Sequence, residues 1–386
     1  MGYIVRLLFV SDSFKGSLTS DDTADLLREA AGQVFGPCEC VGVPVADGGE
    51  GTSDAVIRAT AGQRRTIAVH GPLMERVEAT YGLLGGHRAI VEMAAASGLP
   101  LVAPELRNPL HTTTYGTGEL IRDALDQGVD EVSVALGGSA TNDGGMGCMR
   151  ALGARFLDSR GMELAGTGAD LERVAHIDLS GLHPRARSTS FVAMCDVTNP
   201  LCGPDGATHT FGAQKGATPE MRERLEQGMA TYRDAIIREL GVDPDAIPGS
   251  GAAGGLGAAL AVFLHAELRS GIETVLDLIG FDELLEGTAL VVTGEGKTDW
   301  QSCFGKVLQG VGWRCQRRGV PAVALCGSLG EGGMRILDHG IDSVMVTVNA
   351  PMTLEQAMGN ARAYYLEAAI RMFRLIRVGM RLQVGE

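Results

Sequence analysis

The sequence predicts an α/β protein made of two α/β domains, and three observations support this prediction. Short continuous apolar runs, which are typical of buried parallel strands, occur for example at residues 5–10 and 290–293. These runs lead into polar, glycine-rich loops, and segments with helical spacing of apolar residues follow them. The 386 residues, of which 45% are hydrophobic and 21% charged, suffice for two or three domains with buried cores.

Composition excludes several classes of protein. The 55 glycines have no collagen period and lie in discrete loops. Lys+Arg 33 against Asp+Glu 47 gives a net charge of −14, which repels phosphate backbones and anionic lipids, so we expect no nucleic-acid and no membrane partner. The longest apolar stretch, residues 252–264, is too short to span a membrane. Eight cysteines without a CxxC pair indicate reduced thiols and a cytoplasmic protein.

The first strand and helix are predicted at the N-terminal end. The apolar run at residues 5–10 is followed by Thr19 or Ser20, either of which can cap a helix with Asp21 and Asp22 in its first turn. A second strand at residues 41–45 runs directly into the loop ADGGEGT.

The same alternation resumes near the C-terminus. Three more strands are predicted at residues 290–293, 322–325 and 343–347, and a closing helix at residues 354–378. Two strands at one end and three at the other make five β/α units. That is the number needed for a flavodoxin-like parallel sheet of order 2-1-3-4-5.

The middle of the chain is then a second α/β domain inserted into the first. Its predicted strands lie at residues 89–93, 132–136 and 191–195, and a helix follows Thr218-Pro219. We predict a flavodoxin-like domain of residues 1–65 plus 286–386, an inserted domain of residues 66–285, and an active-site cleft between them. Two contiguous halves remain the alternative, because no linker-like tract marks the boundaries.

The loops after the strands are the places to look for a ligand site, because ligands of doubly wound sheets bind outside the carboxyl ends of the strands. All four lysines, each next to a glycine, lie in such loops or in similar ones: Lys15, Lys215, Lys297 and Lys306. Backbone amides freed by glycine complement a lysine in holding an anion. The alternative is that the chain simply prefers arginine and that these four lysines have no special role.

The sequence contains no P-loop and no GxGxxG motif in the context that nucleotide binding requires. The segment Gly296-Lys297-Thr298 has Val291 where a P-loop has its leading glycine. The GxGxxG match that begins at Gly249 is not preceded by a strand, which argues against a dinucleotide site and an NAD(P)-dependent oxidoreductase. The histidines form no cluster for a metal.

Acids and lysines in glycine loops remain, and this mixture fits metal-phosphate chemistry. The acids are Asp12, Asp47, Glu50, Asp143, Asp196, Glu295 and Asp299. A sensor that binds a hydroxy acid without turnover is the other candidate, but a simple anion site has no need of so many acids.

Several motifs together resemble the type I glycerate kinase family of bacteria: DSFKGSLTS, PVADGGEGT, GGSATNDGG, CDVTNPLCGPDGA, FGAQKGA, PGSGAAGGLGAAL and TGEGKTDWQSCFGK. The resemblance extends over residues 4–375. It implies two α/β domains and an ATP- and Mg²⁺-dependent kinase of D-glycerate, with 2-phosphoglycerate as the favoured product. Lys297 stands where the family often has arginine, and Ala213 where proline is usual.

With this resemblance we assign roles to residues. Asp299 is the first choice for the base and Asp196 the second, because each follows a strand in a loop with phosphate-binding features, although either could simply cap the backbone. Lys15 completes the catalytic group. Predicted substrate-binding residues are Ser13, Lys15, Asp47 and Lys297. Predicted ATP-binding residues are Gly137, Gly138, Ser139, Thr141, Asn142, Asp143, Gly294, Glu295, Gly296 and Lys215. Predicted Mg²⁺ ligands are Asp196, Asp299 and Glu295.

Overall fold

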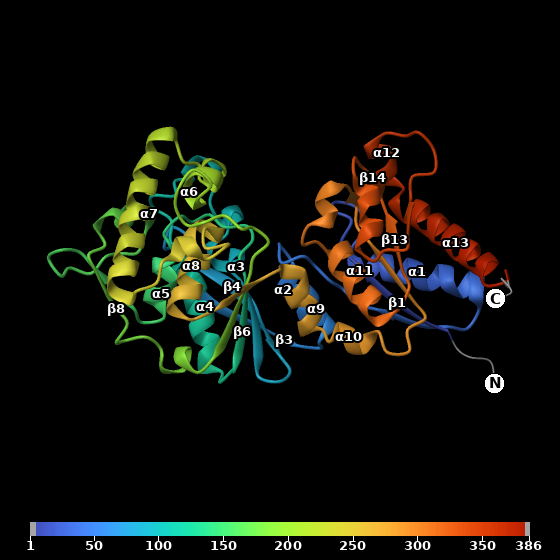
Figure 1. Cartoon of the computed structure of the whole chain (residues 1–386), viewed down its shortest axis with the longest axis horizontal. Helices are drawn as coiled ribbons and strands as arrows, with labels where there is room; N and C mark the ends of the chain where they lie inside the picture. The colour runs from blue at the N-terminus through green and yellow to red at the C-terminus, as the bar shows by residue number, and fades with distance from the viewer. Residues whose placement is uncertain (1–4, 383–386) are drawn as a thin grey trace. The chain divides into compact units, whose positions relative to one another are not determined.

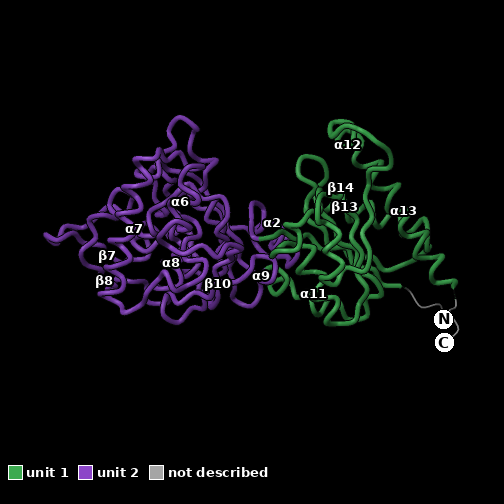
Figure 2. Tube along the Cα trace, turned by 45° about the horizontal axis from the view of Figure 1, so that its top comes forward, with its two compact units in different colours: residues 1–47, 275–386 green, residues 48–274 purple. Residues whose placement is uncertain are grey.

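A computed structural model describes residues 5–382 of the chain (Figure 1). The chain divides into two compact units, which Figure 2 colours separately. Unit 1 comprises Met1–Asp47 and Val275–Glu386, and unit 2 comprises Gly48–Thr274. The divisions therefore lie after residues 47 and 274, where the sequence predicted them after residues 65 and 285.

Residues 48–65 belong to unit 2 because the helix they contain contacts that unit's sheet. Helix α2 (Thr52–Ala59) contacts strands β4 and β5. The amide and hydroxyl of Ser53 both donate to the Glu92 carboxylate at the end of β5, at 2.6 and 2.9 Å. These contacts bind the start of α2 to unit 2.

Unit 1 is built on a five-stranded parallel sheet of order β15-β13-β11-β1-β2. Its strands are β1 (Arg6–Ser11), β2 (Glu39–Gly42), β11 (Leu290–Gly294), β13 (Ala322–Cys326) and β15 (Ser343–Val346). Read from the other edge in chain order, this is 2-1-3-4-5, so the predicted flavodoxin-like order is confirmed.

Helices cover the sheet of unit 1. Helices α1 (Ser20–Phe35) and α13 (Ala361–Gly379) lie side by side (Figure 1) and share a buried core with Leu7 and Phe9 of β1. Side chains alternate along a strand, so the buried Leu8 points to the opposite face. Helix α11 (Val307–Arg318) contacts β1, β11 and β13. As expected, Thr19 caps α1 and accepts from the Asp22 amide.

Two predicted elements of unit 1 differ in detail. Strand β2 ends at Gly42 and does not reach residue 45, because β1 offers it partners only from Arg6 to Phe9 and Pro44 has no amide to donate. The predicted closing helix is two helices, α12 (Leu354–Gly359) and α13, because Asn360 adopts φ −118° and ψ 21° and interrupts the helical path.

Unit 2 is built on a mixed six-stranded sheet of order β10-β9-β6-β5-β4-β3. Its strands are β3 (Gln63–His70), β4 (Arg76–Leu84), β5 (Arg88–Glu92), β6 (Glu131–Ala135), β9 (Ser190–Met194) and β10 (Glu267–Arg269). Strands β5, β6, β9 and β10 are parallel, whereas β3 and β4 form an antiparallel hairpin. The three predicted strands correspond to β5, β6 and β9.

The other helices of unit 2 are α3 (Ala94–Ser97), α4 (Tyr115–Asp126), α5 (Met146–Ala151), α6 (Ala207–Phe211), α7 (Pro219–Leu240) and α8 (Ala252–Phe263). The remaining short elements are β7 (Arg155–Leu157), β8 (His176–Asp178), β12 (Lys297–Thr298), β14 (Ser328–Leu329), α9 (Gly271–Leu278) and α10 (Phe281–Leu284). Among the described residues, no helix is both long enough and apolar enough to cross a membrane.

Candidate active site

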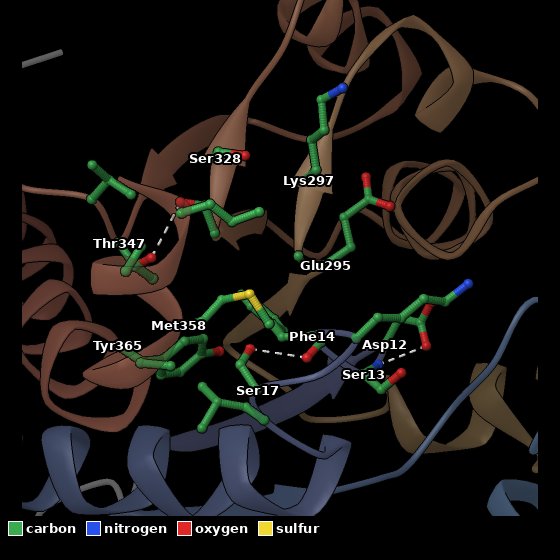
Figure 3. Close-up of a pocket in the computed structure, with 18 of the residues that line it drawn as sticks. Asp12, Ser13, Phe14, Ser17, Glu295, Lys297, Ser328, Thr347, Met358 and Tyr365 are labelled. Atoms are coloured by element: carbon green, nitrogen blue, oxygen red, sulfur yellow. Dashed lines mark hydrogen bonds between the residues drawn. The ribbon is translucent and has the colours of Figure 1, made fainter. Parts of the chain in front are cut away.

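A pocket of about 440 Å³ lies at the carboxyl edge of the unit 1 sheet (Figure 3). Asp12 follows β1, Glu295 follows β11 and Thr347 follows β15, and all three line the pocket. In a parallel sheet of this order the direction in which successive strands are added reverses between β1 and β11, and ligands bind outside the carboxyl ends of the strands at that point. The pocket is therefore where the topology predicts a ligand.

Three of the four lysines line this pocket: Lys15, Lys297 and Lys306. The loop after β1 exposes Lys15 because the Phe14 amide donates to the Leu18 carbonyl at 2.8 Å and closes a tight turn. Gly16 in this turn adopts φ +79°, a conformation that L side chains rarely adopt. Fold and sequence thus place three positive charges around one cavity, as an anion site requires.

Carboxylates stand among these lysines. Asp12, Asp47 and Glu295 line the same pocket. Burial raises the pKa of Asp12 to about 6, and the negative charge of Asp47 adds to the effect, whereas the Ser13 amide and Lys15 oppose it. Burial also raises the pKa of Glu295, although the Ser302 hydroxyl and the charge of Lys306 oppose the rise. Groups whose pKa is raised in this way are typical of functional sites.

The raised pKa of Asp12 predicts a pH-dependent gain in stability for Asp12→Asn. Well below about pH 4 the carboxyl is protonated in both the folded and the unfolded chain, so it does not change the free energy of unfolding. Between about pH 4 and 6 the unfolded chain releases this proton while the folded chain keeps it, so the wild type loses stability over this range and the variant does not; above about pH 6 the difference stays constant. The pKa rises from 3.8 to about 6, and one pKa unit corresponds to about 1.4 kcal/mol. The free energy of unfolding of the variant should therefore exceed that of wild type by up to about 3 kcal/mol at pH 8.

Urea unfolding of both proteins between pH 3 and 8 measures this gain. The matched control is Asp299→Asn, for which the sign is reversed, because hydrogen bonds and Lys297 lower the pKa of Asp299 and its charge stabilises the fold. A stability difference between wild type and Asp12→Asn that does not change with pH would contradict the prediction. The groups that face Asp12 are Lys15, Asp47 and Glu295.

Asp299, the first choice for the base, caps a short helical turn. It accepts from the Gln301 amide at 3.0 Å and lies 3.2 Å from the Lys297 ammonium group. These contacts lower the pKa of Asp299, which weakens it as a proton acceptor. Asp299 is also absent from the pocket wall. The geometry therefore supports the capping role that was weighed as the alternative.

The other predicted ATP-binding and substrate-binding residues of unit 1 lie close together. Ser13 and Gly296 line the pocket with Lys15, Asp47, Lys297 and Glu295. Gly294 is the last residue of β11, and its carbonyl accepts from the Asp12 amide at 2.9 Å. A side chain at Gly294 would meet the Leu325 carbonyl at 2.1 Å, so only glycine fits there. The structure brings these residues together, and their roles stay predictions.

Unit 2 has its own group of loops at the carboxyl edge of its parallel strands. Gly137 and Gly138, both exposed, follow β6, with the half-buried Ser139 next to them. Asp196, which follows β9 and is also exposed, accepts from the Gly271 amide at 3.0 Å. The predicted roles of these exposed residues stay predictions.

The rest of the GGSATNDGG loop is buried. Thr141, Asn142 and Asp143 have no exposed surface. Asp143 accepts from the amides of Thr114, Gly145 and Gly147 at 2.8 to 3.2 Å and from the Thr114 hydroxyl at 2.8 Å. A side chain with so many protein donors organises the loop, which favours a structural role for Asp143; its predicted contact with phosphate stays a prediction.

Lys215 is buried as well. It is 2% exposed, and its ammonium group donates to the Thr141 carbonyl at 2.7 Å. Burial lowers the pKa of Lys215 to about 7, although the nearby Asp143 opposes the fall. The side chain points into the core of unit 2, where it contributes to the structure, and its predicted role in ATP binding stays a prediction.

Some pocket residues received no role from the sequence. The sequence identifies Asp12 and Lys306 only as an acid and a lysine in glycine-rich loops. Thr347 was counted as the end of a strand, but its position after β15 could have marked it. Leu354 and Met358 of α12 also line the pocket, and no sequence signal identified them.

The segment with the GxGxxG match has no Rossmann geometry. It follows a short 3₁₀ turn, Pro244–Ala246, and leads into α8 with Ala253, Gly254 and Gly255 all at positive φ. A dinucleotide-binding turn joins a strand directly to a helix. The argument against an NAD(P)-dependent oxidoreductase therefore holds in the structure.

Comparisons with known proteins identify the family of the chain. The model of the glycerate kinase family matches residues 7–377. Glycerate 2-kinase of Escherichia coli (strain K12) is 43% identical over 378 residues, which cover 98% of this chain and 99% of that protein. Glycerate kinase of Bacillus subtilis (strain 168) is 43% identical over 368 residues, 95% of this chain and 96% of that protein.

A solved structure is similar over the same length. The crystal structure of a Salmonella typhimurium LT2 protein assigned as glycerate kinase 2 has a TM-score of 0.89 and 43% sequence identity. The match covers 98% of this chain and all of that one. On the strength of the family match and of relatives that are similar from end to end, the chain belongs to the glycerate kinase family and is a phosphotransferase.

Proposed function

We propose that this enzyme transfers the γ-phosphoryl group of ATP to the 2-hydroxyl of D-glycerate with Mg²⁺, and that it releases 2-phosphoglycerate and ADP. The observation that carries the proposal is the meeting of three lysines and three carboxylates in one pocket at the topological switch point of unit 1. The name of the Escherichia coli relative, glycerate 2-kinase, supports the choice of the 2-hydroxyl.

The lysines suit the anionic partners of this reaction. Phosphoryl transfer is accelerated mainly by positioning and by neutralising charge on the phosphate oxygens. Lys15, Lys297 and Lys306 offer three positive charges from three separate segments, and the carboxylate of glycerate needs one of them as a partner. A binding-only sensor would gain nothing from Asp12, Asp47 and Glu295 beside these lysines, so the pocket favours a kinase.

The donor set fits Mg²⁺. Among residues 5–382, no group of three or more His, Cys, Asp or Glu side chains could hold a metal on its own. Mg²⁺ usually takes one or two carboxylates together with phosphate oxygens of the substrate, so a preformed cage is not required. Glu295, at the end of β11 and near Lys306, would hold the ion, which when bound neutralises phosphate charge.

We assign the proton of the hydroxyl to Asp12. A general base works best when its pKa lies near the working pH, and that of Asp12 is raised to about 6. Asp12 lies on the pocket wall at the end of β1. Asp299, in contrast, caps the turn at Trp300–Cys303 and does not line the pocket. Asp12 therefore replaces Asp299 and Asp196 as the proposed base.

A coupled assay of ADP release on the purified protein tests the function. D-glycerate, L-glycerate, glycerol and tartronate serve as parallel acceptors with Mg²⁺ and ATP, and phosphorus NMR identifies the product. We expect turnover with D-glycerate, a 2-phosphate product, and loss of activity with a chelator that Mg²⁺ restores. Phosphate on the 3-hydroxyl would overturn the regiochemistry, and no turnover with any hydroxy acid would overturn the proposed substrate.

A further inference from the structure

The pocket of unit 1 has two chemically different ends. One end carries the lysines and carboxylates described above. The other end is mainly apolar, with Phe14, Tyr365 and the α12 side chains of Leu354, Ala357 and Met358, and the hydroxyls of Ser17 and Thr347 lie beside them. In Figure 3, Lys297 and Glu295 lie toward one side of the pocket, and Met358 and Tyr365 lie toward the other.

D-glycerate cannot account for the apolar end. Every carbon of glycerate carries an oxygen, so the molecule has little apolar surface to bury. A cavity of about 440 Å³ is in the range that proteins use for ligands of drug size, which are larger than glycerate. The apolar end therefore fits a second, partly apolar part of a ligand whose other end is anionic.

The apolar wall is held in a defined position. Thr353 and Gln356 form a capping box at the start of α12, with hydrogen bonds of 3.0 and 3.2 Å. Gly16 approaches α12 so closely that a side chain there would meet the Met358 methyl group at 2.9 Å. Leu354 is 76% and Met358 38% exposed, an arrangement that leaves apolar surface uncovered next to the lysines.

We propose that the apolar end binds the purine base of ATP, so that the nucleotide site lies in unit 1, with its phosphates toward Lys15, Lys297 and Lys306. This inference rests on the proposed function for the identity of the nucleotide. A purine has two flat, apolar faces, and it is joined through a ribose to an anionic tail. The pocket shows the same order of chemistry, from the side chains of α12 to the lysines of the loops.

Met358→Gln tests the inference because it keeps the length of the side chain and removes its apolar character. We expect the dissociation constant of a fluorescent ADP analogue and the KM for ATP to rise about tenfold, with the KM for D-glycerate within about twofold. Inorganic tripolyphosphate, which has no base, should bind wild type and variant equally. The matched control is Met334→Gln, an exposed methionine of unit 1 outside the pocket, which should change none of these values.

A second variant, Ala361→Trp, fills the apolar end and should weaken ADP binding more strongly than tripolyphosphate binding. Unchanged ADP affinity in both variants would overturn the inference, as would a rise in the KM for glycerate alone. The proposed function fails separately. If ADP binding depends on Met358 but the wild type phosphorylates no glycerate, the nucleotide pocket stands and the acceptor is wrong.

Discussion

Asp12→Asn is expected to lower kcat by about 10² to 10⁴ while the protein remains folded. The carboxylate sits at the end of β1 on the pocket wall, and its proposed task is to accept the proton of the substrate hydroxyl. Asparagine has the same shape but accepts no proton. The KM for ATP should stay within about threefold, because the three lysines remain in place. Initial rates at saturating substrates measure the effect.

The opposite changes in activity and stability make this result diagnostic. The same variant should be more stable than wild type at pH 8, because it no longer buries a charge. A variant that lost activity because it unfolded would instead show both lower turnover and lower stability than wild type. A gain in stability with a loss of turnover is the expected mark of a group that is retained for function at a cost to the fold.

Asp299→Asn is the matched control for activity. Its carboxylate caps the turn at Trp300–Cys303 and contacts Lys297, so we expect kcat to change by less than about fivefold. If Asp299→Asn abolished turnover and Asp12→Asn did not, the assignment of the base would return to Asp299. A large rise in the Mg²⁺ concentration needed by Asp12→Asn, with kcat unchanged, would also contradict the role of Asp12 as base.

The sequence was most informative where strands are buried on both faces. Strands β1, β11 and β13 are continuous apolar runs with nearly every residue buried, and such runs can be recognised without neighbours. The hairpin of β3 and β4 was missed because it is antiparallel and partly exposed, so its residues alternate and include many polar ones. Its pairing is decided by contacts between strands.

Lysine next to glycine proved a useful but incomplete signal for the site. Three such lysines reached the pocket, whereas Lys215 turned into the core of unit 2. The local sequence is similar in all four cases. What differs is the direction of the side chain, which for Lys215 follows from a 3₁₀ turn that ends at Gly216 with φ +91°. Such a direction is set by the surrounding fold and cannot be predicted from spacing.

The glycines of GGSATNDGG were open to two interpretations, a phosphate loop or a tightly packed one. A side chain at Gly144 would meet the Tyr232 ring at 2.5 Å, and one at Gly145 would meet Ala259 at 2.4 Å. These two glycines thus allow close packing around Asp143, and they do not open the backbone to a ligand. Only the packing partners, which come from distant parts of the sequence, distinguish the two cases.

This structural interpretation predicts a large effect for Asp143→Ala. Removal of the carboxylate leaves the amides of Thr114, Gly145 and Gly147 buried without their acceptor, and each such group costs about 1 to 3 kcal/mol. We expect unit 2 to lose about 3 to 5 kcal/mol of stability, which for a unit of this size lowers its melting temperature by roughly 10 °C. Thermal unfolding followed by circular dichroism measures the shift.

Two further variants separate structure from ligand binding. Asp205→Ala removes an exposed carboxylate of unit 2 and should leave the melting temperature unchanged. Asp143→Asn keeps one acceptor oxygen for the loop amides, so its melting temperature should lie between those of Asp143→Ala and wild type. Its affinity for ADP, measured below the melting transition, should match that of wild type. If Asp143→Asn kept wild-type stability but lost ADP affinity, the carboxylate would belong to the nucleotide site and the structural role would be wrong. Because stability and affinity are measured on the same preparation, one pair of curves decides between the two roles.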